Sequence, residues 1–179
     1  MIEALEDGGA EIRGGEVTEP PPGMSDGGVS VTQYGAKGDG ETDDTEAIQR
    51  ALDAGAGTRV LFPHRGPWKT TRKVLIKGNC FVQGYGGACL HWYGDGGIGV
   101  SESVGGIQYL RVEGFEVNNQ SGDGVSIGLG LNELNNRGYP GGPNVPIDVA
   151  IVCYNKFIRS KVLMNTKPGR MWLCDNLIE

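Results

Sequence analysis

Apolar residues follow two different periods along this chain. Between Asp43 and Gly55 they recur at helical spacing, so that Ile48 and Leu52 fall on one side of a helical wheel while charged and amide side chains cover the other. This pattern predicts one short amphipathic helix that ends at the glycines that follow it. From Thr58 onward the pattern changes to short apolar runs separated by Gly, Asn and Asp.

The short apolar runs predict a strand-rich, all-β body, because runs bounded by turn residues are typical of strands. The predicted strands cover residues 59–62, 73–76, 80–83, 88–92, 107–112, 115–117, 125–127, 147–153, 156–158, 161–163 and 171–173. Glycine is abundant, at 32 of 179 residues, and shows no G-x-y repeat. So many glycines in apolar sequence favour many tight turns.

The segment 34–44 carries the densest local signal in the chain. Its glycines allow a tight irregular turn, and Asp39 is expected to accept hydrogen bonds from nearby main chain. Asp43 is the predicted N-cap of the helix, with Glu46 three residues later as in a capping box. Together with Asp44, these carboxylates place negative charge at the positive end of the helix dipole. A structural role is therefore preferred over a metal or acid/base site.

The order of residues over 34–51, Y-G-A-K-G-D-G-E-T-D-D-T-E-A-I-Q-R-A, resembles the opening signature of the pectate-lyase-like superfamily of right-handed parallel β-helices. A strand that ends at Pro63, with Gly66 and Trp68 just beyond, is similar to the next part of that pattern. The resemblance covers about residues 31–92. It implies a right-handed parallel β-helix (solenoid) whose N-terminal end is closed by the short helix. The superfamily includes polygalacturonase-like and epimerase-like enzymes and many bacteriophage tailspikes.

The chain divides into an extended arm at 1–30, a turn and capping helix at 31–57, and the first rungs of the β-helix at 58–179. The arm is rich in Gly and Pro and holds seven acidic residues and one Arg, whereas the remainder is charge-balanced. This distribution argues against nucleic acid and anionic membranes as partners. The resemblance to tailspikes implies attachment to a phage tail or baseplate protein through residues 1–30.

A faint internal repeat favours stacked turns of chain over a sandwich. Five residues recur 46 positions later with similar character: Val112, Val117, Asn119, Val125 and Ile127 become Ile158, Leu163, Asn165, Met171 and Leu173. The offset equals two turns of about 23 residues, which lies in the range of solenoid repeats. We therefore expect these pairs of positions to stack.

The segment 128–146 is rich in Asn, Gly and Pro and is predicted to be a loop that projects from one corner of the solenoid. Solenoids often carry their binding surfaces on such loops. Tyr139 could stack on a sugar and Arg137 could hydrogen-bond it. Both residues are equally compatible with an ordinary exposed loop.

No catalytic residue is assigned from the sequence. Glu113 and Asp123 are the best candidates for a pair of catalytic carboxylates, although both are also ordinary turn residues. The triplet 159–161, R-S-K, is similar to an element of polygalacturonases, but the elements that should precede it are absent, so the similarity is treated as chance. His64 and His91 are isolated and are predicted to be structural. No cofactor or metal site is expected.

Cysteine spacing and the N-terminal sequence bear on the compartment. Cys80, Cys89, Cys153 and Cys174 have no C-x-x-C spacing and no nearby pair of histidines, so zinc is not expected and buried free thiols are predicted. Residues 1–20 lack the pattern of a signal peptide, and no apolar run reaches the length of a membrane span. We expect synthesis in a reducing host cytoplasm and no membrane insertion.

The resemblance implies the N-terminal part of a phage tailspike or tail fibre, located in the virion, that recognises host surface polysaccharide; whether it also depolymerises that polysaccharide is left open. Resemblance to tailspikes further implies a homotrimer. Two alternatives stay open: a free-standing bacterial polysaccharide hydrolase, lyase or epimerase, and a non-catalytic structural tail adaptor. Residues 171–179 have the character of the middle of a rung. We therefore expect either further rungs beyond Glu179 or neighbouring chains to cover this end.

Overall fold

The computed structural model describes residues 27–94, 97–100, 106–120, 125–129, 147–158, 161–164 and 170–178. Within these ranges the chain is strand-rich and contains one α-helix, which confirms the predicted all-β class. Several sequence predictions lie outside the described residues: most of the arm at 1–30, most of the loop at 128–146, and Asp123, Arg137, Tyr139, Arg159 and Asn165.

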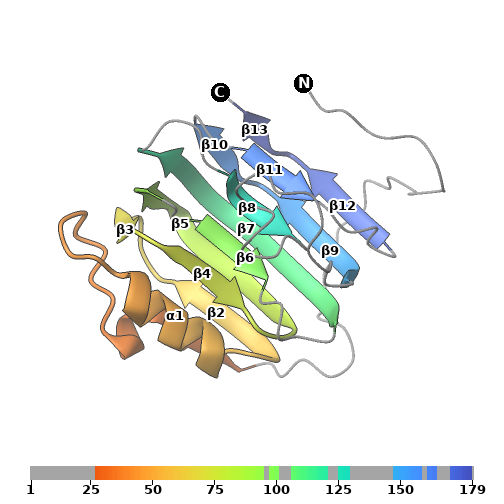
Figure 1. The fold of residues 1–179 in the computed structure, drawn as a ribbon, viewed down its shortest axis with the longest axis horizontal. Helices are drawn as coiled ribbons and strands as arrows, with labels where there is room; N and C mark the ends of the chain where they lie inside the picture. The colour runs from red at the N-terminus through yellow and green to blue at the C-terminus, as the bar shows by residue number, and fades with distance from the viewer. Residues whose placement is uncertain are drawn as a thin grey trace.

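The described strands form two sheets (Figure 1). The nine-stranded sheet contains β1 (Gly28–Ser30), β2 (Thr58–Phe62), β3 (Trp68–Thr70), β5 (Cys80–Trp92), β7 (Ile107–Asn119), β9 (Ile147–Cys153), β10 (Lys156–Ile158), β12 (Arg170–Cys174) and β13 (Leu177–Ile178). The four-stranded sheet contains β4 (Lys73–Ile76), β6 (Gly97–Val100), β8 (Val125–Leu129) and β11 (Lys161–Met164). Every strand pair described is parallel.

The chain passes repeatedly from the large sheet to the small one. We call each pass of the chain through the large sheet, together with any described strand of the small sheet that follows it, a tier. The tiers are β2–β3–β4, β5–β6, β7–β8, β9–β10–β11 and β12–β13. One hydrophobic core lies between the sheets, because Val60, Val82 and Val112 from the large sheet share a cluster with Val74 and Ile98 from the small one. Figure 1 shows the small sheet in front of the large one.

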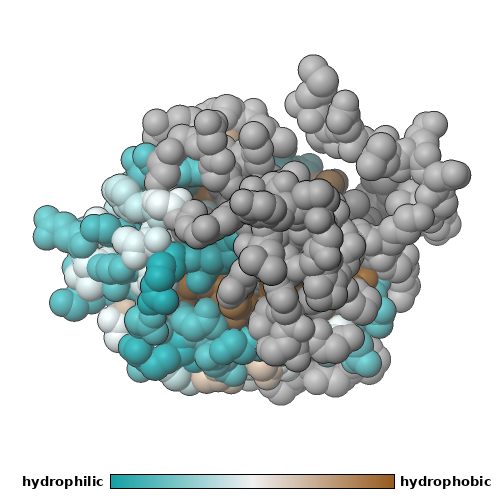
Figure 2. Space-filling model, viewed as in Figure 1, coloured by the Kyte–Doolittle hydropathy of each residue, from teal (hydrophilic) through white to brown (hydrophobic). Residues whose placement is uncertain are grey.

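The predicted amphipathic helix is confirmed as α1 (Thr45–Ala54), which follows the short 3-10 helix η1 (Val31–Tyr34). Ile48 and Leu52 are 1% and 2% exposed and pack at the first tier of both sheets. The surface over α1 and β4 is mainly hydrophilic (Figure 2). The helix thus has one face in the core and one in solvent, as its sequence period requires.

The predicted start of α1 was wrong by one residue. Asp44 is the N-cap, and its side chain makes no capping hydrogen bond. The predicted capping box is absent, because Glu46 pairs with Arg72, and Asp43 accepts from Thr45 and Thr71 instead of from Glu46. A capping box does occur earlier, at η1, where the side chain of Ser30 and that of Gln33 each accept a backbone hydrogen bond.

The predicted 46-residue repeat is also wrong. Val112 pairs with Val152, whereas Ile158 pairs with Asn118. The offset between stacked residues is not constant: it is 27 for Cys89 and Glu116, 40 for Phe115 and Asn155, and 21 for Asn155 and Asn176. The number of residues from one tier to the next therefore varies, and a fixed period cannot align them.

The cysteines only partly follow the prediction of free thiols. Cys80 and Cys89 are buried and free, as predicted. Cys153 and Cys174 instead form a disulfide, which corrects that prediction for this pair. Their Cα atoms are 4.6 Å apart because β12 pairs with β9 in a register that places the two residues side by side. In the part of the chain that the structure describes, no helix has the length and apolar character needed to cross a membrane.

Candidate functional site

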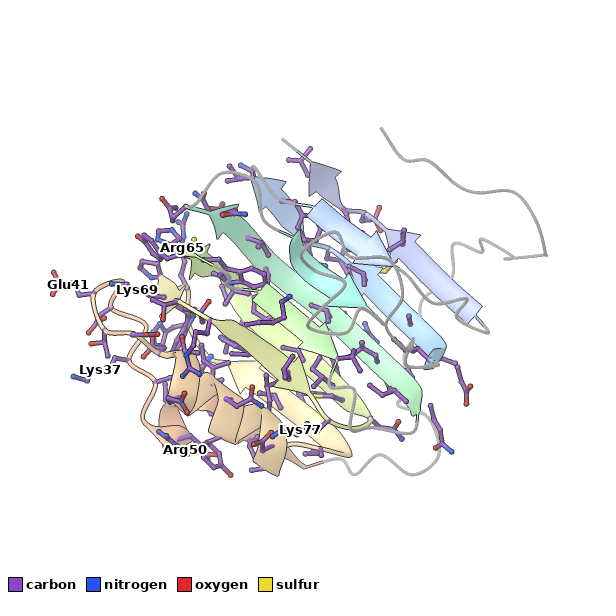
Figure 3. The ribbon with its side chains drawn as sticks, in the orientation of Figure 1. Lys37, Glu41, Arg50, Arg65, Lys69 and Lys77 are labelled. Atoms are coloured by element: carbon purple, nitrogen blue, oxygen red, sulfur yellow. A yellow bond between two sulfur atoms is a disulfide. The ribbon has the colours of Figure 1, made fainter. Side chains whose placement is uncertain are left out.

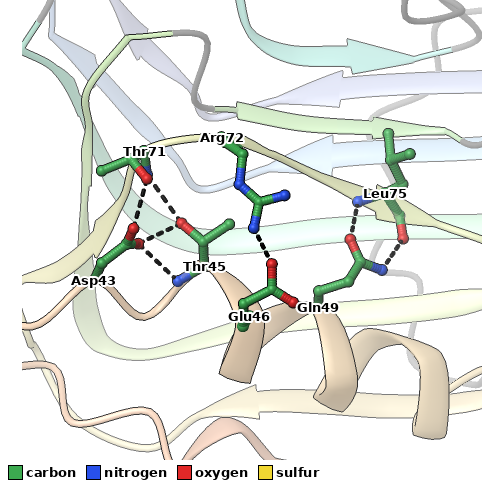
Figure 4. Close-up of polar contacts among 7 residues, drawn as sticks. All are labelled: Asp43, Thr45, Glu46, Gln49, Thr71, Arg72 and Leu75. Atoms are coloured by element: carbon green, nitrogen blue, oxygen red, sulfur yellow. Dashed lines mark hydrogen bonds and ion pairs between the residues drawn. The ribbon is translucent and has the colours of Figure 1, made fainter.

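The three carboxylates at the start of α1 are used to fasten the helix to its surroundings. Asp44 is fully buried and accepts hydrogen bonds from the backbone N–H groups of Lys37 at 2.7 Å and Gly38 at 2.9 Å. Asp43 accepts from the hydroxyl groups of Thr45 and Thr71, each at 2.5 Å, and Glu46 pairs with Arg72 (Figure 4). The predicted structural role of these acids is consistent with these contacts.

The side chains of α1 and the turn before it also protect the first strand edges. The Gln49 amide group donates to the carbonyl of Leu75 at 2.9 Å and accepts from its N–H at 2.8 Å, so it pairs with β4 as a neighbouring strand would (Figure 4). The backbone N–H of Asp44 donates to the carbonyl of Lys69 in β3 at 2.8 Å. Edges closed in this way cannot recruit another strand. We therefore regard this end as structural.

Glu113, one member of the predicted carboxylate pair, is committed to neighbours on the outer face of the large sheet. It is 9% exposed, accepts from the Gln83 amide at 2.9 Å and forms an ion pair with Arg111 at 2.5 Å. The Arg111 guanidinium also lies 4.7 Å from the ring centroid of Phe81, which Arg59 approaches to 5.0 Å. Glu113 is therefore part of a packed ladder across the tiers, and its partner Asp123 lies outside the described residues.

His64 packs against an aromatic ring, and His91 lies within β5. The ring of His64 lies 4.4 Å from that of Trp68, and its Nδ1 atom accepts from the N–H of Gly66 at 3.2 Å. Burial lowers the pKa of His91, and the nearby Glu116 carboxylate partly opposes that shift. Neither histidine faces a nucleophile among its described contacts.

An open groove of about 540 Å³ runs along the corner at which the large sheet bends. We call it the corner groove, and its lining residues are Arg65, Gly86, Gly87, Gly114, Phe115, Glu116, Tyr154, Asn155, Lys156, Asp175 and Leu177. Figure 3 shows Arg65 beside the arrowheads of β3 and β5, on the same side of the molecule as Lys69. The groove thus crosses several tiers, whereas the loop predicted to carry the binding surface lies outside the described residues.

One left-handed residue makes the bend in each of three successive tiers. Gly114 has φ 79°, Tyr154 has φ 57° and Asp175 has φ 50°. Glycine is required at the first position because a Cβ at Gly114 would clash with the carbonyl oxygen of Gly84. The corner therefore has bare backbone at Gly114 and exposed side chains at Tyr154 and Asp175.

A ladder of asparagine side chains holds the corner together behind the groove. Asn155 is 2% exposed, donates to the carbonyl of Val112 at 3.1 Å and accepts from the N–H of Phe115 at 3.1 Å. Asn176 repeats the arrangement one tier later, because it donates to the carbonyl of Val152 at 2.7 Å and accepts from the N–H of Asn155 at 3.0 Å. These bonds satisfy backbone groups that the bend removes from the sheet.

The groove offers charges of both signs with a partly apolar surface. Arg65 and Asp175 are exposed, whereas Glu116 and Lys156 are partly buried and face each other in neighbouring strands. Tyr154 and Leu177 are 58% and 52% exposed. The thiol of Cys89 donates to Glu116 at 3.6 Å, and burial together with Glu116 raises its pKa to about 11, so this cysteine is a poor nucleophile.

Sequence reasoning missed the corner groove. Its residues are separated by tens of positions and come together only through the register of the tiers. A weak signal was present in two dipeptides that end in asparagine, Tyr154-Asn155 and Asp175-Asn176. Among the described residues, no group of three or more His, Cys, Asp or Glu side chains is placed to hold a metal ion.

Comparison with known proteins identifies the first third of the chain. Residues 28–89 match the family described as "Rhamnogalacturonase A/epimerase, pectate lyase-like". The chain carries a pectate-lyase-like segment. This match contains β1, η1, α1, the first tier and part of β5, so it covers the closed end of the two sheets.

Several curated proteins are similar to about a third of the chain. The pre-neck appendage protein of Bacillus phage B103 is 42% identical over 59 residues, which are 33% of this chain and 6% of that protein. Alginate lyase 7 of Azotobacter vinelandii is 38% identical over 66 residues, or 32% of this chain and 8% of the lyase. A protein named "Probable glucan endo-1,3-beta-glucosidase" from Arthroderma benhamiae is 38% identical over 56 residues, or 31% of this chain and 6% of that protein.

The aligned part therefore spans less than a tenth of each of these relatives. The family match covers the closed end of the parallel sheets, and the corner groove lies mostly beyond it. No solved structure gives a significant match.

Proposed function

We propose that the two sheets are faces of one right-handed parallel β-helix that α1 seals at its N-terminal end. Three features support this architecture: the described strand pairs are parallel, the chain passes repeatedly between the two sheets, and one core is shared by both. The left-handed bends with their asparagine ladder would then be one corner of the coil. The pectate-lyase-like match over residues 28–89 agrees with such a coil.

We infer that the protein is the front part of a phage tail appendage that binds bacterial surface polysaccharide. Two observations carry this proposal: residues 28–89, which build the sealed end, match the pectate-lyase-like family, and about a third of the chain is similar both to phage pre-neck appendage proteins and to enzymes named for polysaccharides. In this proposal residues 1–30 attach to a tail or baseplate protein of the virion, and the tiers present the binding surface to the host.

The outer surface of such a coil can also join copies of the chain. We propose a homotrimer, in which three coils lie side by side and bury their flanks. Light scattering of the purified chain coupled to size-exclusion chromatography would give three times the mass of one chain. The mass of a single chain at all concentrations tested would contradict the trimer and leave the appendage proposal standing.

Binding to polysaccharide is tested with the purified chain and surface polysaccharides isolated from a panel of bacteria. Biolayer interferometry should show saturable binding to at least one of them.

Attachment is tested by adding residues 1–30, fused to an inert carrier, to phage tail proteins; capture of a tail protein is the expected result. Capture of a tail protein without glycan binding would instead favour a structural tail adaptor.

A free-standing polysaccharide-degrading enzyme is the second candidate, favoured by the similarity to an alginate lyase and a glucosidase. Incubation of the polysaccharide panel with the chain would distinguish it. Release of new reducing ends shows cleavage, and ultraviolet absorbance from an unsaturated product separates a lyase from a hydrolase. Glycan binding without either signal would leave the chain as a binding module.

A further inference from the structure

Tyr154 occupies a backbone conformation that is unfavourable for a bulky residue. Its φ of 57° is in the left-handed region, where glycine is at ease and an aromatic side chain is strained. The equivalent bend one tier earlier uses Gly114, and the bend one tier later uses Asp175, a residue type that tolerates this region better. Nothing in the bend itself therefore requires a tyrosine.

The ring of Tyr154 does not repay this strain by packing in the core. The residue is 58% exposed, and it lines the corner groove. Its backbone N–H donates to the carbonyl of Cys174 at 3.0 Å, a bond that any residue except proline could make at this position. A strained and exposed aromatic residue in a groove points to contact with a ligand.

We propose that Tyr154 is a stacking platform for one sugar ring of a polysaccharide that lies in the corner groove and runs across the tiers. This inference rests on the proposed polysaccharide-binding function. It adds where the polysaccharide binds, the direction in which it runs and its chemical class. The flat apolar face of a pyranose ring suits an exposed aromatic ring, as apolar faces generally do.

The groove has room for a chain beside Tyr154. A Cβ placed at Gly86 or at Gly87 would meet no other atom within 4 Å, so these glycines border open space. Stacked strands are about 4.8 Å apart, so the bends of successive tiers form a row along the stack. A linear polysaccharide that follows this row would lay successive sugar units over Gly114, Tyr154 and Asp175.

The polar groups around the groove define the class of sugar. Arg65 and Lys156 donate hydrogen bonds, whereas the carboxylates of Glu116 and Asp175 accept them. Hydroxyl groups can do both, so a hydroxyl-rich chain matches this mixture. Because two positive and two negative side chains balance each other, the groove favours an uncharged polysaccharide over a strongly acidic one.

The experiment measures binding of three proteins to the polysaccharide panel: the full chain, Tyr154→Gly and the control Tyr93→Ala. Laminarin serves as the neutral reference polysaccharide and alginate as the acidic one. Tyr93 is also an exposed tyrosine, at 37%, but it contacts Lys69 outside the groove. Tyr154→Gly should weaken binding about tenfold or more. Its thermal midpoint should hold or rise, because glycine relieves the strained bend. The control should bind as the original chain does.

A second variant tests the groove without altering Tyr154. Gly86→Asn places a side chain in the open space while keeping a residue type that tolerates the left-handed φ of 65°. It should also weaken binding. Full affinity in both variants would overturn the groove assignment and leave the proposed function intact, and tighter binding to alginate than to every neutral chain would overturn the sugar class. Absence of binding by the unaltered chain would overturn the proposed function itself.

Discussion

At the scale of single residues, Asp44 connects the glycine-rich turn to the start of α1. Its buried carboxylate accepts two short backbone hydrogen bonds, from Lys37 and Gly38. Asp44→Asn replaces one acceptor with an NH₂ group that faces a backbone donor. We expect the free energy of unfolding in urea to fall by about 2–3 kcal/mol. The control Asp53→Asn, whose partly exposed ion pair with Lys77 is weak, should cost no more than about 1 kcal/mol. Equal losses would contradict this role of Asp44.

Asp39 gives the same turn a dependence on pH. Hydrogen bonds from the backbone N–H and hydroxyl of Thr42, and from the N–H of Glu41, lower the pKa of its carboxyl group from 3.8 to about 2. Because the folded pKa is depressed, the stabilisation is present above pH 3.8 and is lost as pH falls towards 2. Asp39→Asn should therefore have a lower thermal midpoint than the original chain at neutral pH. The difference between the two midpoints should shrink as the pH falls from 3.8 towards 2. A constant difference would argue against the linkage.

At the scale of elements, α1 acts as the lid of the core. Ile48 is 1% exposed and lies against residues of both sheets, so Ile48→Ala leaves a cavity there. We expect a loss of about 2–4 kcal/mol in the free energy of unfolding, measured by denaturant titration. Glu46→Ala removes only an exposed ion pair and should cost less than about 1 kcal/mol. A small loss at Ile48 would mean that α1 is not part of the core.

The elements also show what sequence reasoning can reach. The helix was predictable because its apolar period and the glycines that follow it are local, and the strands were predictable as short apolar runs. Two pairs of predicted strands are in fact continuous: β5 runs through Gly84 to Gly87, and β7 runs through Gly114. The glycines that suggested breaks are bends within long strands. The N-cap was missed because contacts outside the helix decide how these acids are used: Asp44 accepts from the preceding turn, and Asp43 and Glu46 also bind Thr71 and Arg72.

At the scale of the whole molecule, the register between tiers decides which residues meet, and sequence reasoning did not find that register. Glu116, Tyr154 and Asp175 share the corner groove because of the register in which neighbouring strands pair, and the number of residues between those strands differs from tier to tier. A periodic search assumes equal spacing, so the 46-residue repeat aligned the wrong residues. The same register pairs Cys153 with Cys174, and no spacing rule for metal sites or short motifs would find that contact.

The cysteines offer a test of this register in the intact chain. Cys80 and Cys89 are buried, and burial raises their pKa values to about 12 and about 11, while Cys153 and Cys174 are joined. Maleimide labelling counted by mass spectrometry should add almost nothing to the folded chain at neutral pH, because the two free thiols are protonated and covered. Unfolding without reductant should add two labels, and unfolding after reduction should add four. Four labels without reductant would show that β9 and β12 are not linked, and rapid labelling of the folded chain would show that β5 is not packed in the core.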